Sequence, residues 1–134
     1  MADDARVRDS GRGSLKVEVA AGGLIFPGDE PVAVGGTGTG PGPYDLLSAA
    51  LAECTTLTVR LYADRKAWPL ESIEVAVSHE VQAGVTPRDL FRRTVTLKGP
   101  LDDDQLVRLL EIAERCPVHR TLTAGARIET KAAY

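Results

Sequence analysis

The chain has 134 residues, 43% of them hydrophobic and 26% charged, and its 16 basic and 19 acidic side chains leave a formal net charge of −3. This composition excludes bulk disorder and gives no electrostatic footprint for nucleic acid. No apolar stretch is long enough to cross a membrane, and the first residues are too polar for a secretory signal, so we expect a cytoplasmic protein.

The first part of the chain is predicted to hold a tail, a hairpin and a loop. Residues 1–13 show no apolar period and are expected to form a flexible tail, which leaves 14–134 as a single domain. Alternating apolar residues predict strands over 14–20 and 24–26, with a candidate third strand over 31–34. Residues 35–43 are rich in glycine but lack the spacing of a nucleotide-binding loop, so a flexible connection is expected.

A long helix is predicted over residues 44–66, because apolar side chains recur at three- and four-residue spacing and should face the core. This apolar stripe consists of Leu47, Ala50, Leu51, Cys54, Leu57 and Leu61. The later elements are predicted as strands over 73–81, 91–97 and 126–131, a helix from the aspartates at 102–104 to about Cys116, and a short helix over 118–122.

The two cysteines are the residues most suited to chemistry. In a reducing compartment they are either inert buried residues or catalytic thiols, and sequence alone does not pair them. Cys116 is placed at the start of the short helix, near Arg115, His119 and Arg120, where a thiolate is favoured. Cys54 lies within the apolar stripe, and a dry setting raises the pKa of a thiol.

Other kinds of site find less support in the sequence. Cys54, Cys116, His79 and His119 could supply metal ligands, but they lack the paired spacings of zinc sites, so no metal is expected. No cofactor motif or G-x-S-x-G nucleophile turn occurs. His79 alternates with the apolar residues of its strand, which favours a structural role.

Three stretches resemble the osmotically inducible protein C and organic hydroperoxide resistance family. They are GPGPYDLLSAALAEC at 40–54, LYADRK at 61–66 and AERCPVHRTL at 113–122. The resemblance implies an α+β fold in which antiparallel sheet is wrapped around two central helices of an intertwined homodimer. Only 4% of the residues are aromatic, so the core contains few large side chains, and association of two chains would bury additional apolar surface.

The resemblance also implies a cofactor-free peroxidase that serves oxidative-stress defence. Cys54 is then the peroxidatic thiol that becomes a sulfenic acid, and Cys116 resolves it as a disulfide. The implied substrates are organic hydroperoxides, with inorganic peroxide as a further candidate. The implied reductant is an external dithiol such as a lipoyl protein.

The chain departs from the organic hydroperoxide branch at two positions, which places it nearer the OsmC-like branch. That branch has a glutamate after the proline that opens the cysteine helix, and this glutamate pairs with a thiolate-stabilising arginine from an N-terminal loop. Here Tyr44 follows Pro43, and Asp45, one place later, is assigned a supporting role. Residues 14–31 contain no arginine. The remaining candidates for the cation are Arg12, Arg60, Arg65 and Arg115.

Two other functions remain open at this point. The same fold could bind a small apolar ligand at the dimer interface, with both cysteines as packing residues. Alternatively, the helices could simply build an interface for a partner protein.

Overall fold

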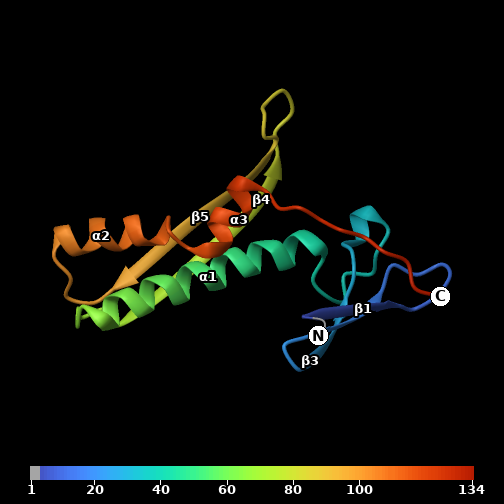
Figure 1. The fold of residues 1–134 in the computed structure, drawn as a ribbon, viewed down its shortest axis with the longest axis horizontal. Coiled ribbons are helices and arrows are strands. Elements are labelled where there is room, and N and C mark those ends of the chain that lie inside the picture. Colours follow the sequence, from blue (N-terminus) through green and yellow to red (C-terminus); the bar gives the residue numbers. More distant parts are fainter. Residues whose placement is uncertain (1–3) are drawn as a thin grey trace. The chain divides into compact units, whose positions relative to one another are not determined.

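The computed structural model describes residues 4–134 and has α+β architecture, as predicted (Figure 1). Its elements are β1 (Ala5–Asp9), β2 (Val17–Ala21), β3 (Leu24–Gly28), the 3-10 helix η1 (Val32–Val34), α1 (Pro43–Arg65), β4 (Ser72–Val81), β5 (Asp89–Lys98), α2 (Asp103–Ala113) and α3 (Pro117–Ala124). The chain divides into two compact units within α1, one ending at Leu47 and the other running from Ser48 to Tyr134.

The first unit is a three-stranded antiparallel sheet in the order β1-β2-β3. Residues 1–13 were predicted to form a flexible tail, but Ala5–Asp9 pairs along its whole length with Val17–Ala21. All five residues of β1 are exposed, so ladder hydrogen bonds rather than burial hold this strand. The candidate third strand over 31–34 is wrong, because residues 32–34 form η1 instead.

A buried carboxylate organises the glycine-rich segment of this unit. Asp29 accepts hydrogen bonds from the hydroxyl groups of Thr37 and Thr39 and from the backbone N–H groups of both threonines and Glu30. The Thr37 hydroxyl is the largest of the influences that hold the pKa of Asp29 well below its ordinary value, against the effect of burial. The segment that was predicted to be a flexible connection is therefore tied to one carboxylate.

Asp29→Asn is expected to loosen this loop and to change the pH dependence of stability. Because the folded state lowers the pKa, the ionised carboxylate stabilises the fold above the ordinary carboxyl pKa, and this contribution is lost as the pH falls towards the folded value. Thermal unfolding from pH 6 down to pH 2 should show the wild type losing its advantage over the variant. Hydrogen exchange should show faster exchange at the amides of Thr37 and Thr39, and unchanged protection there would contradict this role.

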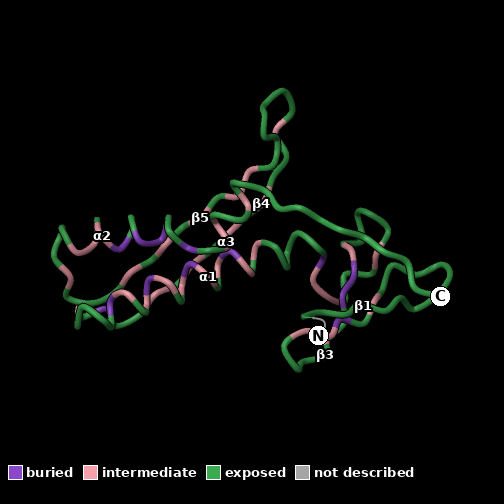
Figure 2. The backbone as a smooth tube through the Cα atoms, in the orientation of Figure 1, coloured by how far each residue is buried: buried purple, intermediate pink, exposed green. Residues whose placement is uncertain are grey.

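The second unit has its core between two helices and a hairpin. In Figure 1, β4 and β5 form a long antiparallel ribbon beside α1 and α2, paired from Ser72↔Lys98 to Val81↔Asp89. The buried residues of this core are Val59, Ala63, Leu70, Leu109, Ile112 and Ala113. Figure 2 shows buried positions along α1 and α2, and half-buried side chains alternate with exposed ones along both strands. One face of the ribbon thus packs on the helices and the other is polar.

The buried face of α1 differs from the predicted stripe. The helix buries Leu51, Thr55, Val59 and Ala63, which follow one another at four-residue steps. Leu47, Leu57 and Leu61 are instead 40%, 53% and 54% exposed. The prediction that these three leucines face the core of the chain is therefore wrong, since a sequence pattern identifies an apolar face but not what covers it.

The C-terminal segment is also different from its prediction. Residues 126–131 have no regular secondary structure, so the predicted strand is wrong, and Ile128 is 88% exposed. A strand requires a partner edge, which an alternating pattern alone does not supply. Within the described residues, no helix is long and apolar enough to span a membrane.

Candidate active site

The two cysteines of the second unit meet at the first turn of α3. The backbone N–H of Val118 donates to Cys54 Sγ at 3.5 Å, and the N–H of His119 donates to Cys116 Sγ at 3.4 Å. Both cysteines are free thiols; Cys54 is half-buried and Cys116 is fully buried. Two sulfur atoms that were 62 residues apart in sequence therefore accept from consecutive amides.

The connection between α2 and α3 fixes Cys116 at this position. Only three residues separate the two helices, and Cys116 is the N-cap of α3, with extended ψ of 134° before Pro117. Proline disfavours helical geometry in the residue before it and suits the first position of a helix. The Cys116 sulfur thus takes the place of the oxygen that usually caps a helix, and it faces the positive end of the helix dipole.

The surroundings act differently on the two thiols. Burial raises the pKa of Cys54, and the neighbouring Cys116 thiol raises it further, against the opposing hydrogen bond from Val118. Burial would also raise the pKa of Cys116, but hydrogen bonding from Cys54, His119 and Thr55 outweighs it and lowers that pKa. The two groups titrate as a pair, and the first negative charge is best placed on Cys116.

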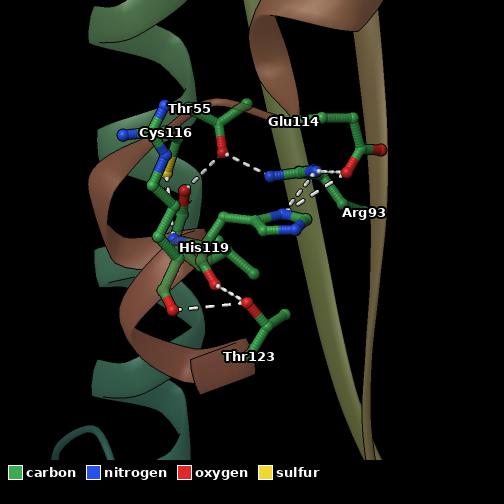
Figure 3. Close-up of polar contacts among 8 residues, drawn as sticks. Thr55, Arg93, Glu114, Cys116, His119 and Thr123 are labelled. Carbon is green, nitrogen blue, oxygen red and sulfur yellow. Dashed lines mark hydrogen bonds and ion pairs between the residues drawn. The ribbon is translucent and has the colours of Figure 1, made fainter. Parts of the chain in front are cut away.

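A cationic side chain lies beside this pair. Arg93, on the helix-facing side of β5, donates from Nη1 to Thr55 Oγ1 at 3.0 Å and from Nη2 to His119 Nδ1 at 3.1 Å. Its Nη2 also lies 3.3 Å from Glu114 Oε2. Figure 3 shows Arg93 between Thr55 on one side and His119 and Glu114 on the other. The guanidinium side chain is 11% exposed, whereas that of Glu114 is 67% exposed.

Nδ1 of His119 lies at the centre of these contacts. A guanidinium group only donates, so Nδ1 is the acceptor in the contact with Arg93 Nη2. Glu114 Oε2 lies 3.5 Å from the same nitrogen. The Arg93 guanidinium therefore contacts both His119 and Glu114, and the exposed carboxylate screens only part of its charge.

The other predicted site residues lie elsewhere. Asp45 belongs to the first unit, where its carboxylate accepts from the Gly42 N–H at 2.8 Å and caps α1. His79 contacts Asp89 at 2.8 Å and the Phe91 ring. Arg60 donates to the Leu70 carbonyl at 2.7 Å. Among residues 4–134, no three side chains of the metal-binding types come together.

Sequence reasoning missed Arg93 and Thr55. A signal for Arg93 was available, because it shares a face of the predicted strand 91–97 with Phe91, Val95 and Leu97. A charge at a core-facing position of a strand requires a buried partner. Thr55 carries no comparable signal, since a threonine on a helix most often bonds its own backbone.

The structure thus places two free thiols at the first turn of one helix within an α+β fold, and the chain can be compared with known proteins on this basis. The family model described as OsmC-like protein matches residues 36–131, which is more than half of the chain. The chain therefore belongs to the OsmC-like protein family. No curated protein matches it significantly.

Solved structures share the fold at low sequence identity. An OsmC-like protein from Mycoplasma pneumoniae is 19% identical with a TM-score of 0.73, over 92% of this chain and 88% of the other. A Psychrobacter arcticus protein assigned to osmotic stress induction and the detoxification response is 20% identical, with a TM-score of 0.73 over 90% and 88%. The organic hydroperoxide resistance protein OsmC from Legionella pneumophila is 22% identical, with a TM-score of 0.66 over 88% and 86%. These likenesses concern the fold.

Proposed function

We propose that the protein is a thiol-dependent peroxidase that reduces organic hydroperoxides through Cys54 and Cys116. The observation that carries this proposal is the convergence of both sulfur atoms on the amides of Val118 and His119. Cys54 is the more accessible thiol, which suits the residue that meets the peroxide. The shared fold with a protein named for organic hydroperoxide resistance supports the proposed substrate class.

The proposed cycle uses no cofactor. The Cys54 thiolate attacks one oxygen of the O–O bond, which breaks to give a Cys54 sulfenic acid and an alkoxide, and the alkoxide takes a proton from water to become the alcohol. Cys116 then attacks the sulfenic sulfur, a disulfide forms, and hydroxide leaves and is protonated to water. An external dithiol reduces the disulfide and returns both thiols. Before the peroxide reacts, the Cys116 thiolate serves as the base that takes the proton of the Cys54 thiol.

We also propose that the working unit is a homodimer formed in part through α1. Leu57 and Leu61 lie one turn and two turns beyond Cys54 on its side of the helix and are more than half exposed. The segment over 126–131, which has no regular secondary structure and contains the exposed Ile128, is a second place where another chain could pair. An exposed apolar face next to a reactive thiol would bind an apolar substrate beside that thiol.

A module that binds a small apolar ligand is the second candidate. The raised pKa of Cys54 favours it, because a thiol that stays protonated reacts slowly with peroxide. This candidate and the peroxidase share the fold and the apolar α1 face, so only the chemistry of the thiols separates them.

The test is to treat fully reduced protein with one equivalent of cumene hydroperoxide, with hydrogen peroxide in parallel, and to follow free thiols and intact mass. Both thiols should disappear within seconds, faster with the organic peroxide, and the mass should fall by two hydrogen atoms. Cys54→Ser should slow peroxide consumption by about a thousandfold or more, because the nucleophile is lost. Cys116→Ser should still react once and leave a sulfenic acid that dimedone traps.

Either of two results would contradict the peroxidase. If Cys54→Ser consumed peroxide at the parent rate, Cys54 would be removed from the mechanism. Slow oxidation that does not distinguish the two peroxides would instead favour the ligand-binding module.

A further inference from the structure

We propose that Arg93 is a positioning residue of the cysteine pair: its guanidinium bridges α1 to α3 and so holds the two thiols at the separation from which a disulfide forms. This inference deepens the proposed function, on which its purpose rests, but neither its geometry nor its test involves peroxide. The bridge acts on the elements that carry the thiols.

Helix α3 has little apolar burial to hold it in place. All eight of its residues lie in the described range and none is fully buried; only Val118, His119 and Leu122 are half-buried. The start of the helix is fixed, because Cys116 is buried and follows closely on α2, whose C-terminal end belongs to the core. Polar contacts therefore contribute much of what holds the rest of α3 against α1.

A direct polar link and a bridged one join the first turn of α3 to α1. The direct link is the Val118 N–H, which donates to Cys54 Sγ at 3.5 Å, and sulfur is a weak acceptor. The bridged link is Arg93 of β5, which donates to His119 Nδ1 at 3.1 Å and to Thr55 Oγ1 at 3.0 Å (Figure 3). On each helix the two links start from consecutive residues, so they hold the same two turns together.

The bridge is well fixed at its α1 end and within the guanidinium itself. Thr55 is fully buried, and its hydroxyl donates to the Leu51 carbonyl at 2.7 Å, which sets the direction from which its oxygen accepts. The donors of a guanidinium form a planar fork, and the Arg93 side chain is only 11% exposed, so water competes little for them. Glu114 adds an ion pair at 3.3 Å, but at 67% exposure it contributes less.

The separation of the thiols decides how readily they form a disulfide. A reaction between two groups of one molecule depends on how much of the time they are held in reacting geometry, and a small displacement can cost a large factor. A disulfide also requires that the two Cα atoms lie within about 7 Å of each other. A bridge that favours the closed pair must in turn be favoured when the disulfide closes it, because such coupling is reciprocal.

The experiment measures the equilibrium of the protein dithiol with glutathione. One oxidised glutathione accepts two electrons and two protons from the thiols of Cys54 and Cys116, which gives the protein disulfide and two reduced glutathione molecules. Arg93→Gln is too short to span both acceptors and should lower the equilibrium constant for the disulfide by about tenfold or more. His119→Phe removes the acceptor on α3, leaves the guanidinium in place, and should lower the constant to a similar extent. Acid quenching and intact mass give the populations.

Two further variants separate the bridge from charge and from general stability. Arg92→Gln is the matched control, because Arg92 is exposed on β5, pairs with Glu80, and should leave the constant at its wild-type value. Arg93→Lys keeps the positive charge but lacks the fork, so its constant should fall as in Arg93→Gln. A merely structural role of Arg93 would destabilise the oxidised and reduced proteins alike and would not move this constant.

The outcomes are distinguishable. Wild-type constants for both Arg93→Gln and His119→Phe overturn the proposal, as does a wild-type pair that forms no disulfide with glutathione. A loss in Arg93→Gln that Arg93→Lys restores also overturns it, because charge and not the bridge would then matter. If the predicted losses occur but wild-type protein does not consume cumene hydroperoxide, the proposed function fails while the positioning role stands. If circular dichroism shows that Arg93→Gln is misfolded, His119→Phe decides the matter.

Discussion

Glutamate at both Leu57 and Leu61 is expected to convert the proposed dimer to monomers, with a dissociation constant raised by about a hundredfold or more. Both leucines lie on α1 outside the core of their own chain and are 53% and 54% exposed. In a dimer, each copy would bury two apolar side chains that the variant replaces by charges, and unpaired buried charges are costly. A factor of a hundred corresponds to about 2.7 kcal/mol. Sedimentation velocity over a concentration series measures it.

The control adds two negative charges elsewhere on the same unit. Ala76 lies on the exposed face of β4, and Ala83 lies in the turn between β4 and β5. Glutamate at both positions should leave the dissociation constant unchanged. Equal behaviour of the two double variants would show that α1 is not the surface of association.

Leu109→Ala is expected to lower the free energy of unfolding by about 2 to 5 kcal/mol, which is a large part of the about 5 to 15 kcal/mol that folded domains possess. Leu109 is fully buried on α2 and belongs to the cluster that joins α2 to Val59 and Ala63 of α1. Truncation removes apolar contacts and leaves a cavity, since the surrounding helices relax only in part. Urea denaturation followed by circular dichroism measures the loss.

Leu110 provides a matched comparison, because the adjacent leucine on the same helix is 48% exposed. Leu110→Ala should cost much less, close to the range of about 0.5 kcal/mol that surface substitutions show. If the two variants were equally destabilised, the burial of α2 would have to be reassigned.

Local sequence signals predicted the elements of the second unit well. The predicted helix over 44–66 corresponds to α1 at Pro43–Arg65, and the predicted strand over 73–81 corresponds to β4 at Ser72–Val81. Their periodicities are set by neighbours along the chain. A tail was predicted where β1 lies, and a strand was predicted over 126–131 where none forms. Both errors arise because strand pairing depends on residues outside the segment itself, which an isolated segment does not reveal.

The candidate site was predictable in its thiols but not in its surroundings. Cys54 and Cys116 stood out by residue type and by the motifs around them, and their roles stay predictions. Their meeting at one helix turn depends on how α1 packs in the second unit, which no spacing encodes. The same holds for Arg93, which reaches Thr55 across 38 residues of sequence. Tertiary packing, and not a local sequence pattern, places the Arg93 guanidinium beside Thr55.

The capping position of Cys116 has a thermodynamic consequence for α3. The N-terminus of α3 lowers the free energy of a thiolate at Cys116, and the thiolate in turn stabilises the helix. By thermodynamic linkage, these two free energies are equal. In the proposed cycle the disulfide carries no charge, so α3 loses this contribution on oxidation and regains it on reduction. The oxidation state of the pair would thus set how firmly eight residues hold their helical form. A reductase that bound at α3 would then contact a helix that is less stable in the oxidised protein than in the reduced protein.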